Sequence, residues 1–187
     1  MSETFRRVWR GIARSDEREP VRGSGEAETK NEKKILFVCT ANVCRSPMAG
    51  AIFNALAEDE GLCVRAESAG VAALKGEGMA PNASIALGEA GIHPGEHRAR
   101  QVSRTMLEEA NLVLVMGPRH KAELRRLFGD HPKQIYTLPE YASGSFDGSH
   151  SGEGEIPDPY GHTMTAYRAS VRQLYDYIER LLERLER

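Results

Sequence analysis

A short segment with the sequence CTANVCRS, residues 39–46, brings together side chains that could act on an anion. A cysteine thiolate is a nucleophile, and helix N-termini and nearby cations favour the thiolate form. The planar guanidinium group of Arg45 can bind two oxygens of one phosphate group, whereas a lysine would offer only a point charge. Ser46 can donate a hydrogen bond to the Cys39 sulfur and later assist its departure. The spacing predicts that Cys39 is a nucleophile and that Arg45 binds the anion it attacks.

Two elements flank this segment and would position it. Residues 35–38, ILFV, are typical of a strand buried on both faces of a parallel sheet. Pro47 suits the first turn of a helix whose apolar face would comprise Met48, Ile52, Phe53 and Leu56. A loop at a helix N-terminus can aim several backbone N–H groups at one phosphate, because those groups are unpaired and carry partial positive charge. The alternative is that Cys39 is only a small buried residue at a strand end. That reading does not explain why Arg45 and Ser46 lie where a bound anion would need them.

Strand and helix patterns alternate along the rest of the chain. We expect strands over residues 63–68, 111–116 and 134–138, and helices after Pro81, over 118–128 and from about Thr163. This alternation predicts an α/β fold with a parallel sheet, in which ligands bind at the carboxyl ends of the strands. From Glu140, about twenty residues rich in Gly and Ser are expected to form a long loop.

Residues 1–33 differ in composition from the rest of the chain. Phe5, Val8, Trp9 and Ile12 have helical spacing among several arginines, and a mixed-charge stretch with almost no apolar residues follows. We interpret residues 1–33 as a charged, disordered extension. A short amphipathic helix that docks on a partner or a membrane surface is the alternative for its first part. Residues 34–187 are predicted to form a single domain.

The overall composition bears on compartment and partners. The 187 residues include 25 Lys and Arg against 27 Asp and Glu, so a formal net charge of −2 gives no general attraction to nucleic acid, and we expect no stable membrane association. No apolar run approaches the ~20 residues that span a bilayer, and the N-terminus lacks the apolar core of a secretory signal. Three cysteines, two of them in one segment, do not resemble a disulfide framework and indicate a cytoplasmic location. A zinc site at Cys39 and Cys44 is a weaker alternative, because no second Cys or His pair at matching spacing follows.

Residues 35–49, ILFVCTANVCRSPMA, resemble the signature of the low-molecular-weight protein tyrosine phosphatases, in the bacterial branch near the protein arginine phosphatases. Residues 158–161, DPYG, are similar to the general-acid loop of that family, here called the acid loop. SAG at residues 68–70, after the second strand, and HRARQ at residues 97–101 also match. The resemblance covers residues 34–187. It implies a four-stranded parallel sheet flanked by helices on both faces, with a phosphate loop (residues 39–46) between the first strand and the first helix.

The same resemblance implies a mechanism. Cys39 would form a phosphocysteine, while Arg45 and backbone N–H groups stabilise the equatorial phosphoryl oxygens. Asp158 would protonate the leaving group and then deprotonate the attacking water, although on composition alone an Asp-Pro pair is usually a turn. Phosphate binding and loop support would fall to Thr40, Ala41, Asn42, Val43, Cys44, Ser46, Ser68 and His97, and the substrate pocket to Val43 and Tyr160. No metal or organic cofactor is needed, and the expected partner is a phosphorylated protein.

Four residues carry a narrower expectation. Asn42 resembles the loop-shaping asparagine of the family, and asparagine tolerates a left-handed backbone better than most residues. Cys44 would protect the nucleophile from over-oxidation through a disulfide, with a small packing residue as the alternative. For His97 the alternative is a solvated loop histidine. Cys63 is expected to be inert core in the second strand.

The identity of the phosphorylated side chain depends on the phosphate loop. Arginine-directed relatives usually carry a threonine where this chain has Val43, and tyrosine-directed members carry an aliphatic residue, so Val43 favours phosphotyrosine. Thr40 and the single aromatic residue of the acid loop are similar to the arginine-directed group, which makes a protein arginine phosphatase the alternative.

Two further alternatives belong to other classes of protein. Thioredoxin-coupled arsenate reductases of this fold need cysteines downstream to relay a disulfide, and the chain has none after Cys63. A non-catalytic phosphate-binding module would be expected to lack Cys39, Arg45 or Asp158, and all three are present.

Overall fold

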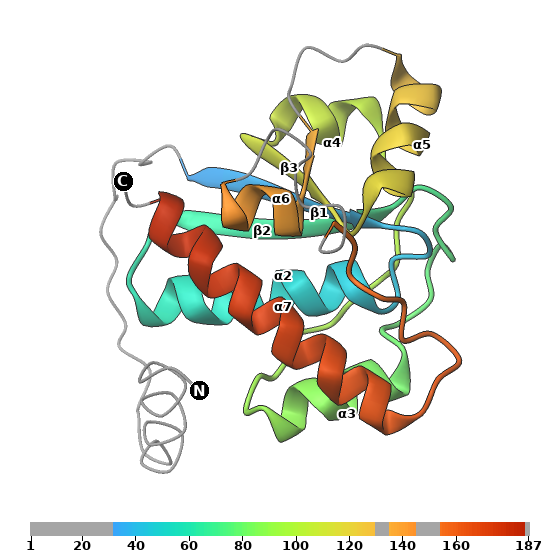
Figure 1. Ribbon diagram of the computed structural model, residues 1–187. Coiled ribbons are helices and arrows are strands. Elements are labelled where there is room, and N and C mark those ends of the chain that lie inside the picture. Colours follow the sequence, from blue (N-terminus) through green and yellow to red (C-terminus); the bar gives the residue numbers. More distant parts are fainter. Residues whose placement is uncertain (1–31, 130–134, 145–153, 186–187) are drawn as a thin grey trace, which may run out of the picture. The chain divides into compact units, whose positions relative to one another are not determined.

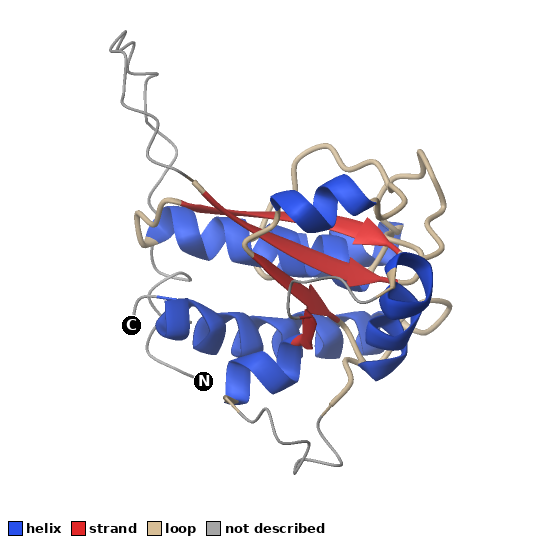
Figure 2. Ribbon diagram, turned by 90° about the horizontal axis from the view of Figure 1, so that it is seen from above, coloured by secondary structure: helices blue, strands red, loops and turns tan. Residues whose placement is uncertain are grey.

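The computed structural model describes residues 32–129, 135–144 and 154–185, which form a four-stranded parallel sheet with helices on both faces. The strands are β1 (Lys33–Cys39), β2 (Val64–Gly70), β3 (Leu112–Val115) and β4 (Ile135–Thr137). Their order in the sheet is β2-β1-β3-β4, and every neighbouring pair is parallel. The strands point the same way in Figure 2, so the loops that follow them meet at one edge. The predicted α/β fold with a four-stranded parallel sheet is confirmed.

Six helices cover the sheet. They are α2 (Arg45–Asp59), α3 (Pro81–Glu89), α4 (Arg104–Glu109), α5 (Pro118–Phe128), α6 (Leu138–Ser143) and α7 (Met164–Leu185) within the described residues. On one face α2 packs on β1 and β2, and α7 lies across α2, α3 and α6. Figure 1 shows α4 and α5 on the opposite side of the sheet. Among the described residues, no helix is both long and apolar enough to cross a membrane.

The strand β1 is the central element that places Cys39. Its residues 35–39 are all buried, as expected for a strand with neighbours on both sides and helices on both faces. Leu36 and Val38 join the core beneath α4 and α5, and the ring of Phe37 meets that of Phe53 on α2 edge-on, with centroids 5.9 Å apart. Each fully buried side chain of this size contributes about 1.5–3 kcal/mol. Cys39 therefore stands at the end of a rigid strand.

Several element boundaries differ by one or two residues from those that the sequence predicts, and two of these differences lie at the site. The helix α2 begins at Arg45, two residues before Pro47, because the whole first helical turn tolerates a residue without an N–H group. Arg45 and Ser46 therefore belong to the helix. Residues 68–70 lie within β2, which runs two residues further than expected. The prediction for Cys63 is wrong, since this residue is exposed and precedes β2.

Two short helices are absent from the expectations above. The helix α6 begins with a capping box, in which the Thr137 side chain accepts from Glu140 N while the Glu140 carboxylate accepts from Thr137 N. Glu140, the expected start of a long loop, is therefore helical. In α4 the side chain of Ser103 caps the first turn. Residues 145–153 of the expected loop and residues 1–31 of the predicted extension (1–33) lie outside the described residues, and Lys33 begins β1.

Candidate active site

The phosphate loop lies at the carboxyl end of β1 and leads directly into α2. Cys39 is the last residue of β1, and Cys44 is the N-cap of α2. This places the loop against the first turn of α2, whose unpaired N–H groups attract an anion. The structure therefore brings the thiol, the loop amides and a helix N-terminus to one place at the edge of the sheet.

Asn42 shapes the loop from its centre. It is the one residue other than glycine with positive φ among the described residues, at 59°, which is the left-handed conformation expected for it. Its fully buried side chain makes three hydrogen bonds. Nδ2 donates to Ser46 Oγ at 3.0 Å and to Ser68 Oγ at 2.9 Å, and Oδ1 accepts from Arg100 N at 2.9 Å. The side chain thus ties the loop to α2, to β2 and to the segment before α4.

Ser46 stands directly behind the thiol. Its Oγ lies 3.0 Å from Cys39 Sγ and 3.3 Å from the carbonyl oxygen of Ala69. Asn42 donates to the Ser46 hydroxyl oxygen, so the single hydroxyl hydrogen is shared between the Ala69 carbonyl oxygen and the Cys39 sulfur. A hydroxyl donor at that distance stabilises a thiolate, which favours both attack by sulfur and its later departure.

His97 and Ser68 lie behind the loop, away from its open side. The carbonyl oxygen of Asn42 accepts a hydrogen bond from His97 Nε2 at 2.7 Å, so the ring is half-buried against the loop. Ser68 accepts from Asn42 at 2.9 Å. Neither side chain lines the pocket described below. Their positions fit residues that support the loop.

Gly70 lets β2 and the loop approach each other closely. A Cβ atom at this position would collide with the carbonyl oxygen of Thr40 and lie 3.1 Å from the Asn42 backbone nitrogen. In the parallel register Gly70 lies beside Cys39. The absence of a side chain therefore allows the loop to pass over the end of β2.

Arg45 reaches from the first turn of α2 to the acid loop. Its side chain is buried, with the residue 4% exposed. Nη1 donates to the carbonyl oxygen of Ile156 at 3.2 Å, and Nη2 forms a short ion pair with Asp158 Oδ2. The other carboxylate oxygen of Asp158 accepts from Tyr160 N at 3.2 Å. Residues more than a hundred positions apart in the chain thus meet at one place.

These groups line a pocket of about 170 Å³. Its walls are formed by Cys39, Thr40, Ala41, Val43, Cys44, Arg45, Asp158 and Tyr160. Val43 is buried, whereas Tyr160 is 59% exposed and stands at the rim. Of the residues expected to bind phosphate or substrate, Thr40, Ala41, Val43, Cys44 and Tyr160 line this pocket. Asn42, Ser46, Ser68 and His97 are not part of its lining. A thiol, a cation and a carboxyl group therefore share one cavity.

Cys44 is a thiol rather than a thiolate at neutral pH. Burial raises its pKa to about 11, while the Tyr167 hydroxyl, 3.7 Å from Sγ, lowers it, and Asp158 and Cys39 raise it further. Tyr167 lies on α7, and its own pKa is raised, chiefly by burial. The structure thus places a second sulfur, held as a thiol, on the wall of the pocket.

Two residues that touch this site are missed by the sequence reasoning. Tyr167 contacts Cys44, and His120 on α5 lies 3.0 Å from the Thr40 hydroxyl. The signal for His120 is its place in the first turn of a helix that follows a parallel strand, since such turns meet at the ligand-binding edge. Tyr167 belongs to the apolar stripe of α7, so no pattern separates it from core residues.

Comparisons with known proteins agree with this geometry. Residues 34–187 match the family model for low molecular weight phosphotyrosine protein phosphatases. The chain is 37% identical over 153 residues to a protein-arginine-phosphatase of Bacillus subtilis, covering 82% of this chain and 97% of that protein.

Two solved structures share the fold. One is a low molecular weight protein tyrosine phosphatase from T. tengcongensis, with a TM-score of 0.74 and 36% identity, covering 81% of this chain and 99% of that one. The other is a mutant of the arginine phosphatase YwlE with a phosphorylated active site serine, with a TM-score of 0.75 and 35% identity, covering 82% and 96%.

Proposed function

Because the chain belongs to the low molecular weight phosphotyrosine protein phosphatase family, we propose that it hydrolyses phosphotyrosine in proteins with Cys39 as its nucleophile. It is a protein phosphatase, and its substrates are phosphoproteins. One observation carries the proposal for the site. The Cys39 thiol, the Arg45 guanidinium group and the Asp158 carboxyl group line the same small pocket.

The first step is an in-line displacement at phosphorus. The Cys39 sulfur forms a bond to phosphorus as the bond to the tyrosine oxygen breaks. Arg45 and the loop amides hold the equatorial oxygens, where negative charge is spread in the transition state. Asp158 gives its proton to the departing phenolic oxygen. The product of this step is a phosphocysteine and a free tyrosine side chain.

The second step returns the enzyme to its starting state. Asp158, now a carboxylate, takes a proton from a water molecule that attacks phosphorus, and the phosphorus–sulfur bond breaks. The sulfur leaves as a thiolate, which the Ser46 hydroxyl at 3.0 Å can stabilise by donating a hydrogen bond. Inorganic phosphate is released. The solved relative with a phosphorylated active site serine supports a covalent route of this kind.

Val43 is the main argument for phosphotyrosine. Its buried side chain lines the pocket and offers methyl groups where a guanidinium group would need a hydrogen-bond acceptor. The exposed Tyr160 ring at the rim can pack on an aromatic ring of the substrate.

Phosphoarginine is the second candidate substrate. The specific observation in its favour is the 37% identity with a protein-arginine-phosphatase. In addition, Thr40 lines the pocket and brings a polar side chain to it. This candidate uses the same nucleophile, arginine and acid.

The test compares kcat/KM on matched phosphotyrosine and phosphoarginine peptides, with Cys39→Ser as the inactive control. We expect metal-independent hydrolysis with a preference for phosphotyrosine, and a shift toward phosphoarginine in Val43→Thr. A wild-type preference for phosphoarginine would replace the first candidate with the second. Absence of Cys39-dependent hydrolysis of either peptide would overturn the proposed role of this site.

The compartment and the domain boundary are also proposals. All three cysteines are free thiols, which supports a reducing, cytoplasmic location; activity confined to the cytosolic fraction would bear this out. The match of the family model to residues 34–187 supports a catalytic domain of that extent. A protein beginning at residue 32, which keeps β1 (Lys33–Cys39) whole, should retain the kcat/KM of the full chain.

A further inference from the structure

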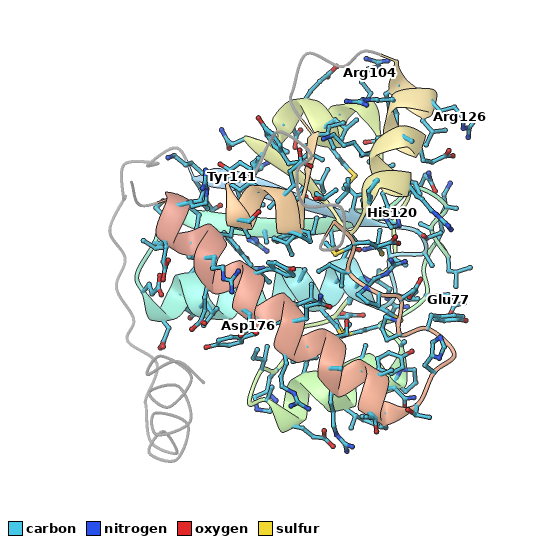
Figure 3. All side chains as sticks on the ribbon, in the orientation of Figure 1. Glu77, Arg104, His120, Arg126, Tyr141 and Asp176 are labelled. Carbon is cyan, nitrogen blue, oxygen red and sulfur yellow. The ribbon has the colours of Figure 1, made fainter. Side chains whose placement is uncertain are left out.

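His120 is a buried histidine in the first turn of α5, and the mechanism above does not use it. It is 5% exposed, and its Nε2 atom lies 3.0 Å from Thr40 Oγ1. Thr40 directly follows the nucleophile in the chain. Figure 3 shows His120 at the end of α5 that approaches the loops following the strands. Since burying an imidazole is costly without hydrogen bonds, the contact with Thr40 is the main polar compensation for its position.

The two nitrogens of the His120 ring have different surroundings. Nε2 faces the Thr40 hydroxyl, while Nδ1 is buried and has no hydrogen-bond partner among the residues that the structure describes. Burial lowers the pKa of His120, and the positive charge of Arg45 lowers it further, so the ring is neutral at neutral pH. A buried N–H group without an acceptor is rarer than an acceptor with an empty lone pair. We therefore assign the hydrogen to Nε2, which then donates to Thr40 Oγ1.

This direction of the hydrogen bond leaves the hydroxyl hydrogen of Thr40 available for another acceptor. Thr40 lines the pocket together with Cys39 and Arg45. Its main-chain carbonyl oxygen accepts from Ala72 N at 3.0 Å, so the residue is held from the β2 side by its backbone and from the α5 side by His120. A phosphoryl oxygen in the pocket is the acceptor that such a fixed hydroxyl group suits.

We propose that His120 is a positioning residue for the phosphatase reaction, which holds Thr40 so that its hydroxyl group donates to the bound phosphoryl group. The inference rests on the proposed function, because the phosphoryl group in question is that of the substrate or of the product. The Thr40 hydroxyl group would be a neutral hydrogen-bond donor to the phosphoryl group, in addition to the loop amides and Arg45. The donor reaches the pocket from the residue after the nucleophile, and α5 fixes its direction.

The test measures the affinity for inorganic phosphate by titration calorimetry and the hydrolysis of p-nitrophenyl phosphate, both on the full chain. His120→Leu removes the donor, whereas His120→Gln keeps an N–H group with similar reach. Thr40→Val removes the hydroxyl group at nearly constant shape. Leu124→Ala, one turn further along α5 in the core, is the control for a merely destabilised helix.

We expect His120→Leu and Thr40→Val each to weaken phosphate binding by about two- to tenfold, which is the usual size of one hydrogen bond. The double variant should be no weaker than the weaker single variant, because both changes break one interaction. His120→Gln should recover most of the affinity. Leu124→Ala should unfold at lower temperature and bind phosphate as the wild type does.

Wild-type phosphate affinity in both His120→Leu and Thr40→Val, or fully additive losses in the double variant, would overturn the inference. Thr40→Val removes the other partner of the same hydrogen bond. The inference can therefore still be tested if His120→Leu alone fails to fold. Failure of the proposed function gives a different result. In that case Cys39-dependent turnover is absent from the wild type, while the pattern of phosphate affinities still reports on His120.

Discussion

Replacing Asn42 with glycine should disconnect the phosphate loop from three supports while keeping its backbone conformation accessible. The φ of 59° is strain-free for glycine but costs about 1–2 kcal/mol for alanine, so Asn42→Gly isolates the loss of the side chain. The lost interactions are the hydrogen bonds to Ser46, to Ser68 and from Arg100 N. At about 0.5–1.5 kcal/mol each, they amount to about 1.5–4.5 kcal/mol.

The loss of these hydrogen bonds should lower the free energy of unfolding by one share of this amount and raise the free-energy barrier of catalysis by a second share. If about half of it holds the loop amides toward the transition state, kcat/KM should fall by roughly tenfold, since about 1.4 kcal/mol corresponds to a factor of ten. Urea denaturation measures the first share, and kinetics with p-nitrophenyl phosphate measure the second. Asn42→Ala should be worse than Asn42→Gly in the denaturation experiment because it adds backbone strain.

Asn54 on α2 offers a matched control for the loss of an asparagine side chain that makes several hydrogen bonds. Its side chain also makes paired hydrogen bonds, donating to Ala66 O at 3.1 Å and accepting from Ala66 N at 2.7 Å, but they join α2 to β2 outside the phosphate loop. Asn54→Ala should therefore lower the free energy of unfolding by about 1–3 kcal/mol with kcat/KM within twofold of wild type. Unchanged stability and unchanged kcat/KM in Asn42→Gly would refute the reasoning.

Three further predictions follow from single contacts. Gly70→Ala should lower stability by about 1–3 kcal/mol, because its Cβ meets a carbonyl oxygen of the phosphate loop. Gly50→Ala meets nothing within 4 Å and should leave thermal unfolding unchanged or raise its midpoint; equal midpoints in the two variants would contradict this. Because the pKa of Cys44 is about 11, iodoacetamide should modify it slowly at pH 8 and faster as pH rises. Tyr167→Phe removes a hydrogen bond that lowers this pKa and should slow the reaction further, as peptide mass mapping can show. Burial lowers the pKa of His120, so the unfolded chain binds its proton more readily and stability should fall as pH drops below about 6.5. In urea denaturation, the free energy of unfolding of His120→Gln should fall less with decreasing pH than that of the wild type. An identical pH dependence in the two proteins would contradict this prediction.

The parts of the site that the sequence predicts from its residues alone are those fixed by local spacing, whereas Asp158 and Tyr160 follow from the family resemblance. The segment from Cys39 to Ser46 lies between a buried strand and a helix start, so its place at the sheet edge follows from chain order alone. The left-handed backbone of Asn42 is likewise a property of that residue type in a tight loop. The parallel sheet follows from the alternation of elements, although its strand order does not.

What the sequence does not reveal depends on contacts between distant segments. Tyr167 reaches the loop from the apolar stripe of α7, where nothing distinguishes it from core residues. His120 reaches the loop from the first turn of α5, a position that indicates the ligand-binding edge but no particular contact. The short helix α6 is fixed by its capping box, a local signal that the Gly- and Ser-rich composition after it obscures. Cys63 shows the opposite error, because an apolar residue next to a strand need not enter the core.

The contacts of Arg45 connect substrate binding to the position of the acid. Its two terminal nitrogens are engaged by the Ile156 carbonyl oxygen and by the Asp158 carboxylate. A phosphoryl group bound through both nitrogens must take at least one of these positions, and its negative charge repels the carboxylate. The Asp158 side chain is 47% exposed and lies on the wall of the pocket. We therefore expect phosphoryl binding to release Asp158 from Arg45, and Asp158 must then take up a proton before it can act as the proposed acid.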